Sequence, residues 1–166
     1  MQELKDTQSE ADTRNISIDR VGVKGLRFPI QIQDKLNRIQ STVATVSLAV
    51  DLPEEFKGTH MSRFVEALHQ HGPLLDVHTA LAIPRELLRR LSARRSHVEM
   101  EFPFFRSKNA PVTGIEGLMD YVVRFEMEAE ANNKLADFKL TVIVPVTTLC
   151  PLSLIHISEP TRLALI

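Results

Sequence analysis

Alternating apolar and polar residues predict most of the strands in this chain. In residues 42–53, Val46, Leu48 and Val50 fall on one side of an extended segment, and Pro53 ends it. This period of two is typical of a strand with one buried face. The same alternation recurs at residues 96–105, 120–130 and 131–146, and a shorter strand is expected at residues 27–34.

In the middle of the chain the apolar period changes to that of a helix. Residues 58–72 place apolar side chains at helical spacing: Met61, Phe64, Val65 and Leu68. Positions i, i+3, i+4 and i+7 lie on one face of a helix, so this segment is predicted to be amphipathic. Thr59 is expected to cap its N-terminus and Gly72 its C-terminus.

A second helix is predicted to open at Pro84, because proline is favoured in the first turn of a helix. It continues through residues 85–95, with an apolar face of Leu87, Leu88 and Leu91. The arginines of this segment are interpreted as a solvated face, since charged residues on a helix normally point into water.

The order of these elements predicts the fold class. Two strands, two helices and three further strands follow one another, and the last two strands are expected to form a hairpin around Asn132 and Asn133. We therefore predict an α+β domain, with an antiparallel sheet and two helices on one face. Residues 1–14 are polar and aperiodic, so we expect them to be disordered.

Composition narrows the class of protein. A chain of 166 residues with 43% hydrophobic and 25% charged residues suits one soluble domain. A net charge of -1 favours neither a nucleic-acid nor an anionic membrane partner. One cysteine allows no internal disulfide, and neither a signal peptide nor a membrane-spanning run is recognisable. We expect a cytoplasmic protein.

The first turn of the predicted helix at residues 58–72 is one candidate for binding chemistry. His60, Ser62 and Arg63 stand together there, where free backbone N–H groups and an arginine can bind an anion. The simpler alternative is that Ser62 and Arg63 only face solvent at a helix start. The spacing alone leaves both interpretations open.

Cys150 is the second candidate, because it follows a strand-like run and a thiolate is a good zinc ligand. A lone cysteine, however, is more often a small buried hydrophobic residue. From the residues alone the buried thiol is the simpler interpretation.

Taken together, these segments resemble the type IB GTP cyclohydrolases. The resemblance is carried by DTRNISIDRVGVKGLRFPI, STVATVSLAVDLPEEFKGTHMSRFVEAL, SHVEMEFPFF, APVTG, LMDYVVRF and VPVTTLCP, and it spans nearly all of residues 12–151. It implies a tunnelling fold (T-fold), in which modules assemble around a pore. It also implies a homo-oligomer, typically a tetramer, with active sites near subunit interfaces.

The resemblance further implies a reaction and a set of site residues. GTP and water would give 7,8-dihydroneopterin triphosphate and formate, with zinc or manganese activating the water that attacks C8 of guanine. Cys150 lies in the family's cysteine motif and is expected to be a metal ligand and catalytic residue. His60, Ser62 and Arg63 lie in the matching GTHMSR stretch, which suggests binding of the substrate or its phosphates.

The chain departs from the family after its cysteine motif. Leu152 replaces a second cysteine, Arg162 stands at the distance of the family's histidine ligand, and His156 has the wrong spacing. Residues 15–151 are therefore interpreted as the first module of a bimodular cyclohydrolase. Residues 152–166 are interpreted as a tail foreign to the family. We expect this fragment to be inactive and to bind zinc weakly, because a catalytic zinc needs about three protein ligands.

Two alternatives to a cyclohydrolase stay open. One is another T-fold enzyme that uses Cys150 as a nucleophile, as in nitrile reduction on a deazapurine. The other is a module without catalytic activity that only oligomerises through its sheet.

Overall fold

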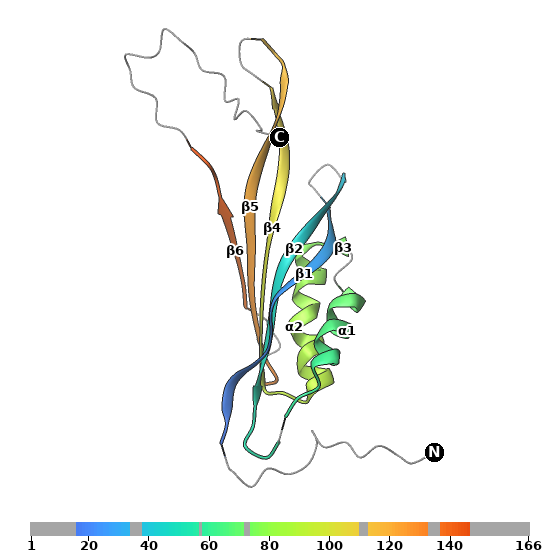
Figure 1. The fold of residues 1–166 in the computed structure, drawn as a ribbon, viewed down its shortest axis with the longest axis vertical. Helices are drawn as coiled ribbons and strands as arrows, with labels where there is room; N and C mark the ends of the chain where they lie inside the picture. Colours follow the sequence, from blue (N-terminus) through green and yellow to red (C-terminus); the bar gives the residue numbers. More distant parts are fainter. Residues whose placement is uncertain are drawn as a thin grey trace.

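The computed structural model describes residues 16–33, 38–56, 58–71, 74–109, 113–132 and 137–146. In these ranges the chain forms β1 (Ile18–Gln33), β2 (Ile39–Leu52), α1 (Met61–His71), β3 (Leu74–Leu75), α2 (Val77–Leu91), β4 (Arg95–Asn109), β5 (Glu116–Glu130) and β6 (Asp137–Ile143). The sheet order is β3-β1-β2-β4-β5-β6, with antiparallel pairs except between β1 and the short β3. Both helices lie on one face of the sheet (Figure 1), which confirms the predicted α+β architecture and agrees with a T-fold.

The predicted alternation places the core as expected. Val98 of β4 pairs with Leu48 of β2 and with Met127 of β5, so three apolar side chains line up across the sheet. All three are buried, because α1 and α2 cover this face with Phe64, Leu68, Ile83 and Leu87. The alternating strands therefore bury their apolar side against the helices and leave their charged side open.

Helix α1 follows the prediction in most respects. Phe64 and Leu68 are fully buried and Val65 is half-buried, but Met61 is 43% exposed. Met61 was expected to be covered with them, but it is the first residue of the helix and is not among its buried residues. The predicted C-cap, Gly72, lies outside the described residues.

The predicted start of the second helix is wrong, because α2 begins at Val77 and holds Pro84 in its interior. Asp76 caps the helix: the Thr79 backbone N–H donates to Asp76 Oδ1 at 2.7 Å, and the Asp76 N–H donates to Thr79 Oγ1 at 2.8 Å. This reciprocal capping box fixes the start of α2 at Val77, well before Pro84. Pro84 has no backbone N–H, so the helix lacks one hydrogen bond at this residue, and its side chain is buried in the core.

The predicted end of this helix is wrong as well. Helix α2 stops at Leu91, where Ser92 takes a left-handed conformation with φ of 51°. The Ala93 N–H then donates to the Leu88 carbonyl at 3.2 Å, which closes the last turn. Arg95, expected to be helical, is already the first residue of β4.

Strand β1 is much longer than the strand expected at residues 27–34. The prediction missed its first part because two register shifts against β2 break the alternation there. One shift lies between Ile18 and Val21 and the other between Val23 and Leu26. Gly25, with φ of 74°, sits in the second shift. A Cβ at Gly22 would lie 1.9 Å from the Leu48 carbonyl oxygen, so only glycine lets β1 and β2 approach this closely.

The ladder between β2 and β4 ends at the pair of Thr45 and Glu101. Beyond it, side chains of β2 bridge the gap to β4. Gln40 donates from Nε2 to the Phe105 carbonyl at 3.0 Å and accepts from the Phe105 N–H at 2.8 Å. Thr42 donates to the carbonyl of Pro103, which has no N–H of its own to offer. The far ends of β4 and β5 then project past the helices (Figure 1).

Strands β5 and β6 form the predicted antiparallel hairpin, although Asn133 of the expected turn lies outside the described residues. Phe138 of β6 packs against the core, but the rest of the apolar side of this strand is more exposed than its alternation would suggest, because α1 and α2 do not reach it (Figure 1). Leu140 is 52% exposed and Val142 is 48% exposed. Within the described ranges, neither helix has the length and apolar content needed to cross a membrane.

Candidate functional site

The structure brings together two of the three candidate residues at the start of α1. His60 and Arg63 are half-buried and line a cavity of about 110 Å³ with Asp51 of β2 and Ser92 after α2. Ser62 is exposed and does not line this cavity. The cavity therefore joins the start of α1 to the end of α2.

Arg63 has a structural partner in this place. Its Nη1 donates to the carbonyl oxygen of Arg90 at 3.0 Å, in the last turn of α2. A cation beside the carbonyl end of a helix is favourable, because the helix dipole is negative there. Arg63 thus holds the two helices together, and only the remaining N–H groups of its guanidinium are available to an anion.

A second, ionic cluster also ties the two helices together, and it is centred on Glu86 of α2. Its side chain is only 10% exposed and accepts hydrogen bonds from both Arg89 and Arg90. The Arg89 hydrogen bonds, followed by those of Arg90, hold the pKa of Glu86 at about 2, below its ordinary value of 4.5. Arg90 also reaches Glu66 and Gln70 of α1. The interpretation of these arginines as a solvated face is therefore wrong for Arg90.

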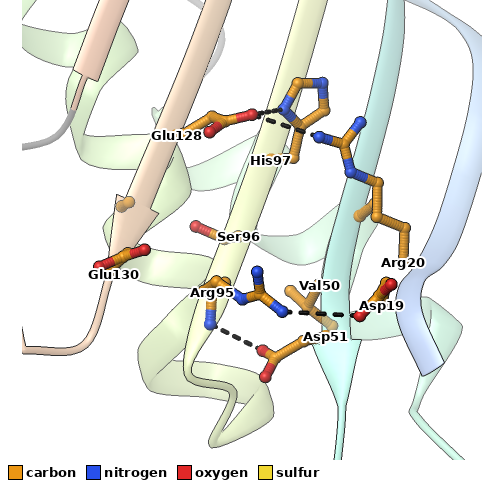
Figure 2. A pocket seen from close by; sticks show the side chains of 11 residues that line it. Asp19, Arg20, Val50, Asp51, Arg95, Ser96, His97, Glu128 and Glu130 are labelled. Carbon is orange, nitrogen blue, oxygen red and sulfur yellow. Dashed lines mark hydrogen bonds and ion pairs between the residues drawn. The ribbon is translucent and has the colours of Figure 1, made fainter. Parts of the chain in front are cut away.

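A third cluster of charged groups lies on the face of the sheet that the helices leave open (Figure 2). Glu128 of β5 faces His97 of β4 at 2.8 Å and accepts from Arg20 of β1 at 3.3 Å. Arg95 forms an ion pair with Asp19 at 3.6 Å, and these groups surround a hollow of about 70 Å³. Sequence analysis did not bring these residues together.

The shape of β1 explains how this cluster forms. Arg20 reaches Glu128 although β2 and β4 lie between their strands, so the sheet is strongly curled at this end. The register shift between Ile18 and Val21 lets the neighbouring residues Asp19 and Arg20 both contact the open face. A bulge increases the local twist of a strand, which favours this curl.

This cluster contains both basic and acidic side chains, so it does not select for either an anion or a cation. Two arginines and His97 face four carboxylates, and Asp51 is already occupied by the backbone N–H groups of Arg94 and Arg95. The contact with Glu128 orients the His97 ring, as carboxylates commonly do. The pairs join β1 to β4 and β5, and we assign them that structural role.

The residues described here do not form a metal centre. No group of three or more His, Cys, Asp or Glu side chains in the described ranges is arranged to hold an ion. Cys150 lies outside these ranges, which end at Val146. The described residues therefore do not fit a bound metal.

Comparison with known proteins identifies the family. The family model described as type I GTP cyclohydrolase folE2 matches residues 4–161. The chain belongs to this family. A curated relative named GTP cyclohydrolase FolE2, from Akkermansia muciniphila, is 99% identical over 153 residues, which are 92% of this chain and 58% of the relative.

More distant relatives carry the same name and match a similar share. The protein from Fervidobacterium nodosum is 48% identical over 150 residues, covering 90% of this chain and 57% of its own. The protein from Methylobacillus flagellatus is 46% identical over 150 residues, covering 90% and 56%. The chain thus spans a little more than half the length of the curated relatives it matches.

Proposed function

We propose that this chain is part of a GTP cyclohydrolase that converts GTP and water to 7,8-dihydroneopterin triphosphate and formate. The observation that carries the proposal is the 99% identity over 153 residues to a protein named GTP cyclohydrolase FolE2. The family match over residues 4–161 supports it independently. Because the chain covers 58% of that relative, the activity is assigned to the full-length protein.

The proposed site includes Cys150 as a metal ligand, with zinc or manganese as the metal. When bound, such an ion lowers the pKa of a water molecule toward neutrality and so supplies a nucleophile. The support for Cys150 is its place in the VPVTTLCP stretch, together with the preference of zinc for thiolates. The other ligands would come from the remainder of the full-length chain.

His60 and Arg63 are proposed to contact the substrate triphosphate. Both line the same cavity, and Arg63 keeps part of its guanidinium for a ligand while donating to the Arg90 carbonyl. Ser62 was expected to share this role, but it is exposed and does not line the cavity. We further propose a cytoplasmic homo-oligomer, a tetramer in the full-length protein.

The proposal is tested with the full-length protein and its Cys150→Ala and Cys150→Ser variants. We expect both variants to form product from GTP more than about 100-fold more slowly and to retain less metal after dialysis. Thr141→Ala, in β6 and outside the VPVTTLCP stretch, is the matched control and should keep both properties. A Cys150→Ala variant with full activity and full metal content would refute the assignment.

Removal of the metal by a chelator distinguishes a metal-dependent cyclohydrolase from an enzyme that uses Cys150 as a nucleophile. We expect removal of the metal to abolish product formation from GTP and readdition of zinc or manganese to restore it. An activity that survives chelation but not Cys150→Ser would indicate a cysteine nucleophile instead.

A further inference from the structure

Arg90, in the last turn of α2, holds α1 at three places. Its carbonyl oxygen accepts a hydrogen bond from Arg63 Nη1 at 3.0 Å. Its guanidinium donates to Glu66 Oε2 at 2.8 Å and to Gln70 Oε1 at 2.6 Å. These three partners are three and four positions apart, so they lie on one face of α1. A single residue of α2 therefore contacts α1 over about two helical turns.

The side chain of Arg90 is itself held in place. Its Nε donates to Glu86 Oε1 at 2.5 Å, and the side chain is only 24% exposed. Glu86 lies one turn earlier on α2 and is 10% exposed. A guanidinium presents its donors in one rigid plane, so bonds to three acceptors on two helices fix its orientation. Rotation or sliding of α1 against α2 would break at least one of these bonds.

These contacts bear on the cavity of about 110 Å³ at the start of α1. Arg63 lines this cavity, and Ser92, two residues after Arg90, lines it from the side of α2. Arg90 is not among the lining residues. The bond from Arg63 to the Arg90 carbonyl uses one N–H of the guanidinium. The direction of its other N–H groups is therefore set by where the last turn of α2 lies.

We propose that Arg90 is a positioning residue, which holds the Arg63 guanidinium in the orientation that binds the substrate triphosphate. It acts through Arg63, without contact to the ligand. A side chain that is already oriented loses less conformational freedom when an anion binds, and this raises affinity. The inference rests on the proposed role of Arg63 in substrate binding.

Calorimetric binding of inorganic triphosphate to the metal-free full-length protein tests the proposal. We expect Arg63→Ala and Arg90→Ala each to weaken binding about tenfold. Arg89→Ala is the matched control and should change binding less than about twofold, because Arg89 is 69% exposed and its described ion pair is with Glu86 on its own helix. Unchanged binding by the Arg90→Ala protein would overturn the proposal, and so would an equal loss in the Arg89→Ala protein. If the Arg63→Ala protein binds normally, the anion site itself is wrong and the proposal falls with it.

A double-mutant cycle separates positioning from a general effect on the fold. If Arg90 acts through Arg63, adding Arg90→Ala to Arg63→Ala should weaken triphosphate binding by less than about twofold more. A further loss of about tenfold would show that the two residues act independently, which contradicts the proposal. If the Arg90→Ala protein does not fold, Arg90→Lys is read in the same way, because one ammonium group does not reproduce the fork of donors that binds three acceptors.

Steady-state kinetics with GTP give a second readout. We expect Arg90→Ala to raise KM about tenfold and to change kcat less than about twofold, because the triphosphate is remote from the guanine ring that reacts. A lower kcat with unchanged KM would contradict the positioning role. If the full-length protein does not act on GTP, the proposed function fails, and the binding of inorganic triphosphate still decides whether Arg90 positions Arg63.

Discussion

Two parts of the same strands differ in what covers them. Val98 and Met100, in the first half of β4, are fully buried beneath the helices, whereas Arg106 and Lys108, on the same side of its second half, are exposed. Both halves pair with β5 in one uninterrupted register that runs from Arg95 to Asn109. The backbone ladder therefore forms along the whole strand, but only the helix-covered part adds a hydrophobic core. Burial, not strand pairing, separates the two parts.

This difference also bears on function. The helix-covered part contains the cavity with His60 and Arg63, while the uncovered part leads through β6 toward the stretch that holds Cys150. The proposed substrate contacts thus lie beside the helix-covered core. The proposed metal ligand follows a strand whose apolar side still lacks a covering layer.

The largest expected effect comes from replacing a leucine by alanine in the helix-covered part, compared with the same replacement in β6. Leu87 in α2 is fully buried, and Leu140 in β6 is 52% exposed. We expect Leu87→Ala to lower the free energy of unfolding by about 2–5 kcal/mol and Leu140→Ala by less than about 1 kcal/mol. Urea denaturation of the 166-residue chain measures both. Equal losses would show that the comparison is wrong.

A smaller effect is expected at Glu86, inside the covered part. Its folded pKa of about 2 lies below the ordinary value of 4.5, so its ionised form stabilises the fold fully above pH 4.5, and this contribution is lost as pH falls from 4.5 through about 2. We expect Glu86→Gln to cost about 1–2 kcal/mol at pH 7, allowing for the exposure of Arg89, and only a small fraction of that at pH 2. Glu66→Gln, at a 56% exposed carboxylate, is the control. A loss at Glu86 that does not vary with pH would exclude the ionic mechanism.

The capping box of α2 comes next in size. Asp76→Ala removes the acceptor for the Thr79 backbone N–H and should cost about 1 kcal/mol, whereas Asp76→Asn should restore most of it. Thermal unfolding followed by circular dichroism compares the two variants. If alanine and asparagine are equivalent here, the cap does not set the start of α2.

The smallest effect is expected at the boundary between the two parts. Gln40→Ala removes both hydrogen bonds to the Phe105 backbone, and we expect a loss of about 0.5–1 kcal/mol. Exchange at the Phe105 amide should accelerate, while exchange at Met100 should stay unchanged. Acceleration at both amides would mean that the ladder is one cooperative unit.

The sequence predicted the elements whose pattern is regular. Alternation located β2, β4 and β5, and helical spacing located α1, because one buried face repeats at a fixed period in each. The length of β1 was missed because its register shifts break the period. The start of α2 was missed because Pro84 resembles a first-turn residue, although Asp76 and Thr79 carried the capping signal.

The candidate site was less predictable, for a different reason. His60 and Arg63 are close in sequence, so their shared cavity followed from local spacing. The pairing of Arg20 with Glu128 joins residues 108 positions apart and depends on the curl of the sheet, which no local pattern encodes. Cys150 rests on the family resemblance and stays a prediction.

Amide hydrogen exchange along β4 of the 166-residue chain tests the comparison most directly. Val98 and Met100 lie under the helices, and Arg106 and Lys108 lie in the uncovered half of the same ladder. We predict that the first two amides exchange at least about 1,000-fold more slowly than the last two, because only they require opening of the covered core. Uniform exchange along β4 would contradict the account.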